Sequence, residues 1–120
     1  MQFYFEKLEV WQNSRSFVKD IYIITANFPD NEKFGLITQI RRASLSISAN
    51  IAEGMSRKTD KDKARFISIS FGSAIEVVNF LILANDLSII DSKDYNSLRD
   101  QLEKITNQLN SLHNKLIPKT

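Results

Sequence analysis

Several residue types are missing or scarce in this chain, and each scarcity excludes a class of protein. None of the 120 residues is cysteine, so disulfide bonds, thiolate metal sites and a cysteine nucleophile are excluded. Only three residues are glycine and two are proline, while 25% are charged. This composition is typical of one ordered helical domain and not of a disordered tail.

The hydrophobic segments typical of exported and membrane proteins are not evident from the sequence. Residues 1–6 do not combine a basic region with a long apolar segment, so no signal peptide is predicted. The longest mostly apolar run, residues 77–84, is too short to cross a bilayer and contains Asn79. We therefore expect a cytoplasmic protein with no membrane partner.

Motifs for catalysis and metal binding are lacking. The single histidine, His113, is far in sequence from the acidic residues of interest, and no Glu-x-x-His motif exists. Di-iron bundles need two such motifs, and zinc sites need more nitrogen or sulfur ligands. No glycine-rich phosphate loop or nucleophile elbow is present. The sequence predicts no enzyme, no metal and no cofactor.

Helical periodicity is the dominant positive signal. The last segment has an aliphatic residue at every third or fourth position, namely Leu98, Leu102, Ile105, Leu109, Leu112 and Leu116. Asp91 and Thr59, each followed by an aspartate three residues later, predict two helix N-caps. We predict helices over residues 5–27, 32–55, 60–87 and 92–117. Together they predict an all-α, up-down-up-down antiparallel four-helix bundle, a single domain over residues 1–120.

The buried faces of the first two helices follow from the same spacing. The predicted stripe of the first helix is Leu8, Trp11, Val18, Ile21, Tyr22 and Thr25, widened by Phe17, Ile24 and Phe28. That of the second is Leu36, Ile40, Ala43, Ile47, Asn50 and Gly54. Gly54 then occupies the position expected of a helix C-cap.

Small residues on the second and third helices predict a close helix crossing. If the two helices are antiparallel, Ala43 and Ser44 lie level with Gly72 and Ser73. A glycine inside a helix costs about 0.5–1 kcal/mol relative to alanine, so Gly72 is expected to permit this contact.

Three polar residues on the same two helices, Asn50, Glu53 and Glu76, predict a structural clamp that fixes the helix register. Asn50 lies on the predicted core stripe. Glu53 lies near a helix C-terminus, where a negative charge is unfavourable without a partner. The cations within its reach are Arg57, Lys61, Lys63 and Arg65, while Arg41 or Arg42 is within reach of Glu76.

Positive charge is concentrated between residues 41 and 65, although the chain has a net charge of only +2. Seven basic residues and three acidic residues give this segment a net charge of +4. The basic residues are Arg41, Arg42, Arg57, Lys58, Lys61, Lys63 and Arg65. They predict a surface for nucleic-acid phosphates, although a solvated helix end explains the loop charges equally well. No aromatic residue interrupts the basic loop, so base stacking is not expected.

The second and third helices have few charges on their outer faces. Residues 43–52 contain none, and Glu76 is the only charge between residues 66 and 85. Leu45 projects away from the predicted core stripe. A bundle helix normally presents charge to solvent, so a second buried surface and a homo-oligomer are expected.

Several short motifs specify a family. They are Leu8-x-Val10-Trp11-Gln12, Phe28-Pro29-x-x-Glu32-x-Phe34-Gly35-Leu36, Gln39-Ile40-Arg41-Arg42-Ala43, Ser46-Ile47, Asn50-Ile51-Ala52-Glu53-Gly54, Arg65-Phe66, Gly72-Ser73 and Glu76. Together they resemble the four-helix-bundle proteins encoded in 23S ribosomal RNA intervening sequences. That family is similar to the accessory variability determinant proteins of diversity-generating retroelements. The resemblance implies a pentameric ring that binds nucleic acid. Val77-Val78-Asn79 departs from the family pattern.

Two functions follow from these observations. The first is a non-enzymatic homo-oligomer that associates with RNA or DNA through the basic residues. The second is a protein-interaction scaffold, for instance an adaptor for a protein partner encoded nearby. A small-molecule or metal-binding bundle is disfavoured, because only Asn50 and Thr25 offer polar groups near the core.

Overall fold

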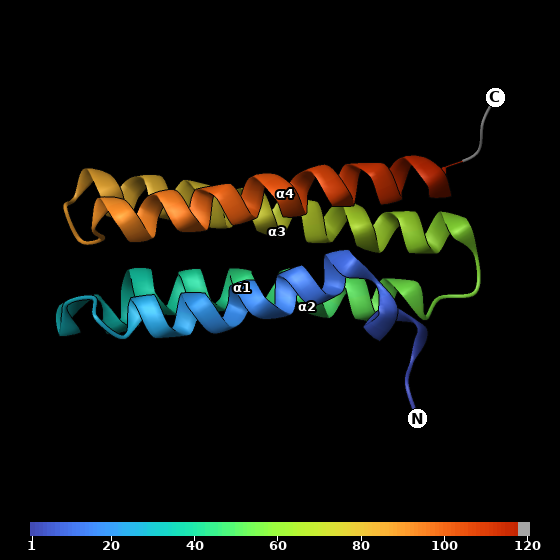
Figure 1. Cartoon of the computed structure of the whole chain (residues 1–120), viewed down its shortest axis with the longest axis horizontal. Coiled ribbons are helices and arrows are strands. Elements are labelled where there is room, and N and C mark those ends of the chain that lie inside the picture. The colour runs from blue at the N-terminus through green and yellow to red at the C-terminus, as the bar shows by residue number, and fades with distance from the viewer. Residues whose placement is uncertain (118–120) are drawn as a thin grey trace.

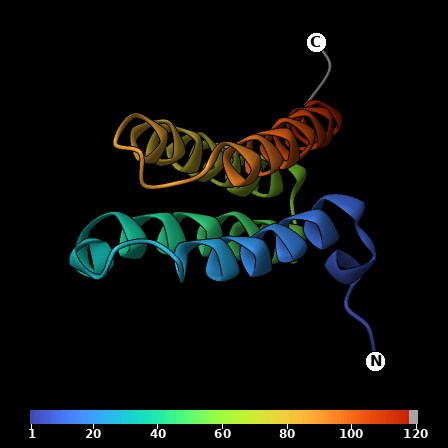
Figure 2. The same cartoon turned by 60° about the vertical axis from the view of Figure 1, so that its left-hand side comes forward.

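Four long helices make up the computed structural model, which describes residues 1–117 and, for residues 33 and 34, the backbone only. They are α1 (Glu9–Thr25), α2 (Thr38–Met55), α3 (Asp60–Asp86) and α4 (Ser92–Leu116). Figure 1 shows α1 and α2 in one layer and α3 and α4 in the other, and the turned view in Figure 2 keeps the layers apart. No strand occurs in residues 1–117, so the all-α prediction is confirmed. Residues 118–120 of the predicted domain lie outside the described range.

Both predicted N-caps are confirmed. The Thr59 hydroxyl accepts a hydrogen bond from the Asp62 amide at 3.1 Å, and an Asp91 carboxylate oxygen accepts one from the Asp94 amide at 2.7 Å. Each satisfies a backbone donor that the first turn of a helix leaves unpaired. These caps fix the starts of α3 and α4.

The first two helices begin later than predicted. Leu8 has an extended backbone (φ −78°, ψ 129°) that separates the 3-10 helix η1 (Tyr4–Lys7) from α1. Before α2, the chain forms the 3-10 helix η2 (Asp30–Glu32) and the π-helix η3 (Lys33–Ile37). The helices predicted to start at residues 5 and 32 therefore included these shorter elements, which the structure separates from α1 and α2.

The core lies between the layers and confirms the stripe of α4. Leu98, Leu102, Ile105 and Leu109 are buried, whereas Leu112 and Leu116 are half-buried near the helix end. Burial of a large aliphatic side chain contributes about 1.5–3 kcal/mol. The regular stripe of α4 is therefore a main source of stability.

The predicted stripe of α1 is confirmed at Phe17, Ile21 and Thr25 and wrong at Tyr22. The buried residues are Val10, Ser14, Phe17, Ile21 and Thr25, whereas Tyr22 is exposed. The two hydroxyls in this stripe donate to backbone carbonyls of α1, Ser14 to Trp11 at 2.7 Å and Thr25 to Ile21 at 2.6 Å. A polar side chain can be buried once it is hydrogen-bonded.

The most extensive helix contact is between α2 and α3, but Gly72 does not take part in it. Gly72 is exposed, and a Cβ atom built there meets nothing within 4 Å. The close contacts are instead Ser46 Oγ to Ser73 Oγ at 2.8 Å and Ser70 Oγ to the Ile47 carbonyl at 2.8 Å. The Gly72 prediction was wrong because Gly72 lies on the exposed face of α3, between the buried residues Ser70 and Ala74.

Gly54 has the role that was predicted for Gly72. It lies inside α2, which ends at Met55 with Ser56 as its C-cap, and no described glycine has a positive φ. A Cβ atom on Gly54 would lie 2.5 Å from the Cβ atom of Phe66. Gly54 is therefore not a C-cap but the residue that lets α3 approach α2 closely.

Candidate nucleic-acid interface

Five of the predicted basic residues gather at one end of the bundle. We call Arg57, Lys58, Lys61, Lys63 and Arg65 the basic turn, because they occupy the α2–α3 connection and the first turns of α3. This connection is the green segment at the right-hand end of Figure 1. Lys58 and Lys61 are exposed and make no ion pair with any residue in the range 1–117. Their charges are available to an external anion.

Two arginines of the basic turn rest on one aromatic ring. The guanidinium carbons of Arg57 and Arg65 lie 4.5 Å and 4.7 Å from the ring centroid of Phe66. Arg57 also donates to Glu53 at 2.8 Å. A planar guanidinium can stack on a ring and still use its N–H groups for acceptors. The stack holds both cations in place at the surface.

Arg41 is not part of this surface. Its Nε donates to the Thr25 hydroxyl at 2.9 Å, a terminal nitrogen donates to the Tyr22 carbonyl at 3.3 Å, and the guanidinium lies 4.5 Å from the Tyr22 ring centroid. Tyr22 and Thr25 belong to the last turn of α1, where a cation is favourable. Arg41 therefore joins α2 to the end of α1.

Arg42 is exposed but distant from the basic turn. It precedes the end of α2 by thirteen residues, which corresponds to about 20 Å along a helix. One chain therefore does not bring the seven predicted basic residues into a single surface. The basic turn holds five of them.

The three predicted clamp residues have different environments. Asn50 donates to the carbonyl and the hydroxyl of Ser46, at 2.8 Å and 2.9 Å, and Ser46 in turn contacts Ser73 of α3. Glu53 pairs with Arg57 and not with the basic residues of α3. Glu76 is exposed and makes no hydrogen bond or ion pair within the described part of the chain. Neither Arg41 nor Arg42 contacts it there.

Sequence reasoning missed the aromatic residues beside the basic turn. Residues Phe3, Tyr4 and Phe5 line a cavity together with the last turn of α2, and η1 packs against α2. Figure 1 accordingly shows the N-terminal segment at the same end as the α2–α3 connection. The aromatic run is evident in the sequence, but its contact with residues 52–56 is long-range and has no periodic signature.

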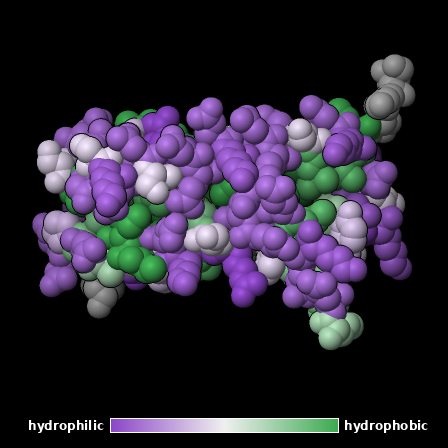
Figure 3. Space-filling view, viewed as in Figure 1, coloured by the Kyte–Doolittle hydropathy of each residue, from purple (hydrophilic) through white to green (hydrophobic). Residues whose placement is uncertain are grey.

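The outer faces of α2 and α3 expose aliphatic side chains. Leu45, Ile69, Ile75, Ile82 and Leu83 are each 40–48% exposed. By length and composition alone α3 could cross a membrane, a test that core helices of soluble proteins also pass, and only 33% of its most apolar stretch is buried. The opposite face, which α1 and α4 dominate, is mainly hydrophilic in Figure 3.

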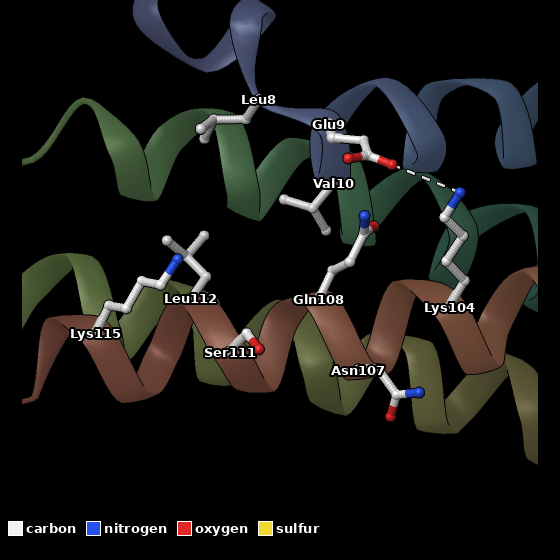
Figure 4. Close-up of a pocket in the computed structure, with 9 residues that line it drawn as sticks. All are labelled: Leu8, Glu9, Val10, Lys104, Asn107, Gln108, Ser111, Leu112 and Lys115. Atoms are coloured by element: carbon white, nitrogen blue, oxygen red, sulfur yellow. Dashed lines mark ion pairs between the residues drawn. The ribbon is translucent and has the colours of Figure 1, made fainter.

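A groove of about 450 Å³ lies between the start of α1 and the second half of α4. Figure 4 shows Leu8, Val10 and Leu112 directed into it, with the Glu9–Lys104 ion pair (3.5 Å) at one side. Among the described residues, no three histidine or acidic side chains are grouped to hold a metal ion.

Comparison with known proteins identifies the family. The family model of the 23S rRNA-intervening sequence proteins matches residues 6–111. A crystal structure from Bacteroides thetaiotaomicron, a protein with unknown function from the S23 ribosomal protein family, superimposes with a TM-score of 0.79. It is 26% identical and covers 87% of this chain and 97% of its own. No curated protein shows significant similarity. The chain belongs to the 23S rRNA-intervening sequence protein family.

Proposed function

We propose that this up-down-up-down antiparallel bundle is a non-enzymatic homo-oligomer that binds nucleic acid, RNA foremost, through the basic turn. The observation that supports this most directly is the group of exposed cations at one end of the bundle. Lys58 and Lys61 have no intrachain partner within residues 1–117, and the Phe66 ring holds Arg57 and Arg65 in place. The family name, which refers to an intervening sequence of ribosomal RNA, favours RNA.

Each copy can make only a few phosphate contacts, so oligomerisation is part of the proposal. Linked copies that engage one nucleic acid multiply weak individual contacts into a higher overall affinity. Contacts of this kind are directed at the phosphate backbone and depend strongly on salt. Binding is therefore expected to be poorly selective for sequence.

The aliphatic outer faces of α2 and α3 supply the surface for assembly. Arg42 is the exposed cation on that face of α2, and Glu76 is the exposed anion among the aliphatic residues of α3. A head-to-tail contact between the α2 face of one copy and the α3 face of the next would pair these charges. Repetition of such a contact closes a ring, and the resemblance to ring-forming bundles suggests five copies.

Light scattering tests the assembly. The wild type is expected to have about five times the 13.8 kDa mass of one chain. Arg42→Glu and Glu76→Arg should each lower the mass, because like charges then meet at the contact. The double variant should restore it. A monomeric wild type, or two single variants that assemble normally, would contradict this interface.

Fluorescence anisotropy with labelled structured RNA and duplex DNA tests nucleic-acid binding. The variant K58E/K61E is expected to weaken binding at least tenfold at low salt. Its slope of log affinity against log salt should be shallower by about 2, one unit for each lost phosphate contact. The matched control K19E/K93E changes the net charge equally at two exposed lysines away from the basic turn.

Two outcomes of this measurement would reject the proposal. If the two double variants weaken binding equally, only net charge matters and the basic turn is not a site. If the wild type does not bind even at low salt, the exposed aliphatic face points instead to a protein-interaction scaffold. A partner recovered from the native host after nuclease treatment would then support that second function.

A further inference from the structure

The cavity beside the basic turn lies between N-terminal residues 3–5 and the end of α2. Phe3, Tyr4 and Phe5 form one side, and Ala52, Met55 and Ser56 of the α2 end form the other. Its volume is about 440 Å³, within the range of small-molecule pockets. The lining is mostly aromatic and aliphatic.

The aromatic side of this cavity is held in place. The Phe3 amide donates to the Glu6 carboxylate at 2.7 Å, and the rings of Phe3 and Phe5 stack with centroids 6.1 Å apart. Phe5 in turn contacts the Trp11 ring edge to face at 5.0 Å. Even so, Phe3 and Tyr4 remain 58% and 61% exposed. The stacked Phe3 ring and the neighbouring Tyr4 ring are therefore both accessible from solvent.

The charge around the cavity indicates which ligand it fits. Glu53 contributes to the lining and is bonded to Arg57 at 2.8 Å, so the cationic side chain lies beside the cavity. Lys58 follows directly in the chain. The carboxylate and the apolar lining disfavour a phosphate inside the cavity, whereas phosphates outside it are attracted to Arg57 and Lys58. A ligand with a flat apolar group and an anionic backbone matches both the apolar cavity and the cations beside it.

We infer that this cavity accepts an unpaired nucleobase of a single-stranded nucleic acid, with the flanking phosphates on the basic turn. A base can stack on an aromatic ring whatever its sequence, because every base has a π face. Paired bases in a duplex are not accessible in this way. The inference rests on the proposed function and refines it, since it predicts a preference for single strands or loops over duplexes.

The test compares a single-stranded oligonucleotide with a duplex of the same length by anisotropy. The variant F3A/Y4A should weaken single-strand binding about 5- to 100-fold, the range for a lost base–aromatic stack, and leave duplex binding unchanged. The matched control I23A/L87A removes two exposed aliphatic side chains outside the cavity. Circular dichroism melting verifies that each variant folds.

A second measurement uses the unaltered protein. Photocrosslinking of a single strand that contains 4-thiouridine should label peptides with residues 3–5 or 52–56, and an excess of unlabelled single strand should abolish the label. Crosslinks confined to other peptides would overturn the inference, even if the variants fail to fold.

The remaining outcomes separate the cavity from the basic turn. If F3A/Y4A weakens single-strand and duplex binding equally, the base-binding inference is wrong while phosphate binding stands. The same conclusion holds if F3A/Y4A changes the affinity for neither ligand. If K58E/K61E abolishes binding to both ligands, the proposed function is supported whatever the cavity does. If the wild type binds neither ligand, both proposals fail.

Discussion

Arg41 and Arg57 lie towards opposite ends of α2, and their guanidinium groups are bound differently. Both lie 4.5 Å from the centroid of an aromatic ring, Arg41 over Tyr22 and Arg57 over Phe66. Arg41 is half-buried and donates to a hydroxyl and a carbonyl in the last turn of α1. Arg57 is exposed, lies over the Phe66 ring and pairs with Glu53 one turn away. An arginine whose donors are satisfied by a neighbouring helix stabilises the fold. An exposed arginine with one intrachain acceptor keeps further N–H donors for a ligand.

The largest effect on stability is expected from substitution of Gly54, which lies near the Arg57 end of α2. Gly54→Ala places a methyl group 2.5 Å from the Cβ atom of Phe66, so the helices must move apart. Such overpacking costs about 1–3 kcal/mol. It should also weaken nucleic-acid binding, because the ring beneath Arg57 and Arg65 is displaced. Urea unfolding followed by circular dichroism measures the change.

Gly72→Ala is the matched control for this experiment. Its Cβ atom meets open space, so alanine should stabilise the chain by about 0.5–1 kcal/mol through helix propensity. Equal effects of the two substitutions would show that the contact between Gly54 and Phe66 is not tight.

An intermediate effect on stability is expected from substitution of Arg41. Arg41→Gln removes the charged donor at the end of α1 and should lower the free energy of unfolding by about 1–2 kcal/mol. Nucleic-acid affinity should not change. Lys19→Gln, at an exposed position on α1, removes the same charge and should alter stability by less than about 0.5 kcal/mol. A loss of affinity in Arg41→Gln with unchanged stability would reverse the assigned roles.

The smallest effect is expected from Glu53→Gln. The pair with Arg57 is solvent-exposed, with side chains 41% and 56% accessible, so its loss should cost about 0.3–0.5 kcal/mol at low salt. Removal of the carboxylate should raise the affinity of the basic turn for nucleic acid. Glu9→Gln breaks the exposed pair with Lys104 and should leave affinity unchanged. Weaker binding in Glu53→Gln would mean that Glu53 positions Arg57 for the ligand.

The accuracy of the sequence predictions depended on how local each feature is. The stripe of α4 and the caps at Thr59 and Asp91 follow from spacing within one helix, and all were confirmed. The stripe of α1 was confirmed at Phe17, Ile21 and Thr25, but Ser14 was missed, because a serine is buried there with its hydroxyl bonded to its own backbone. Periodicity alone does not distinguish a buried hydroxyl from an exposed one.

Features that depend on contacts between helices were harder to predict. Gly54, and not Gly72, lies at the close contact because Gly54 is on the buried face of α2 and Gly72 is on the exposed face of α3. The partner of Arg41 lies in α1, and the inward position of this side chain depends on where α1 ends. The aromatic residues 3–5 lie against the end of α2 because the extended backbone at Leu8 separates them from α1. None of these contacts leaves a local pattern.

The bend at Leu8 also sets which end of the molecule tolerates an attachment. A fusion partner placed ahead of Met1 would leave the fold next to the cavity of residues 3–5 and close to the basic turn (Figure 1). It could occupy or shield both. A fluorophore on the connection at Asp30–Glu32 would sit at the far end of the bundle. A label at the α1–α2 connection is therefore expected to leave the proposed binding surface free, whereas an N-terminal fusion is not.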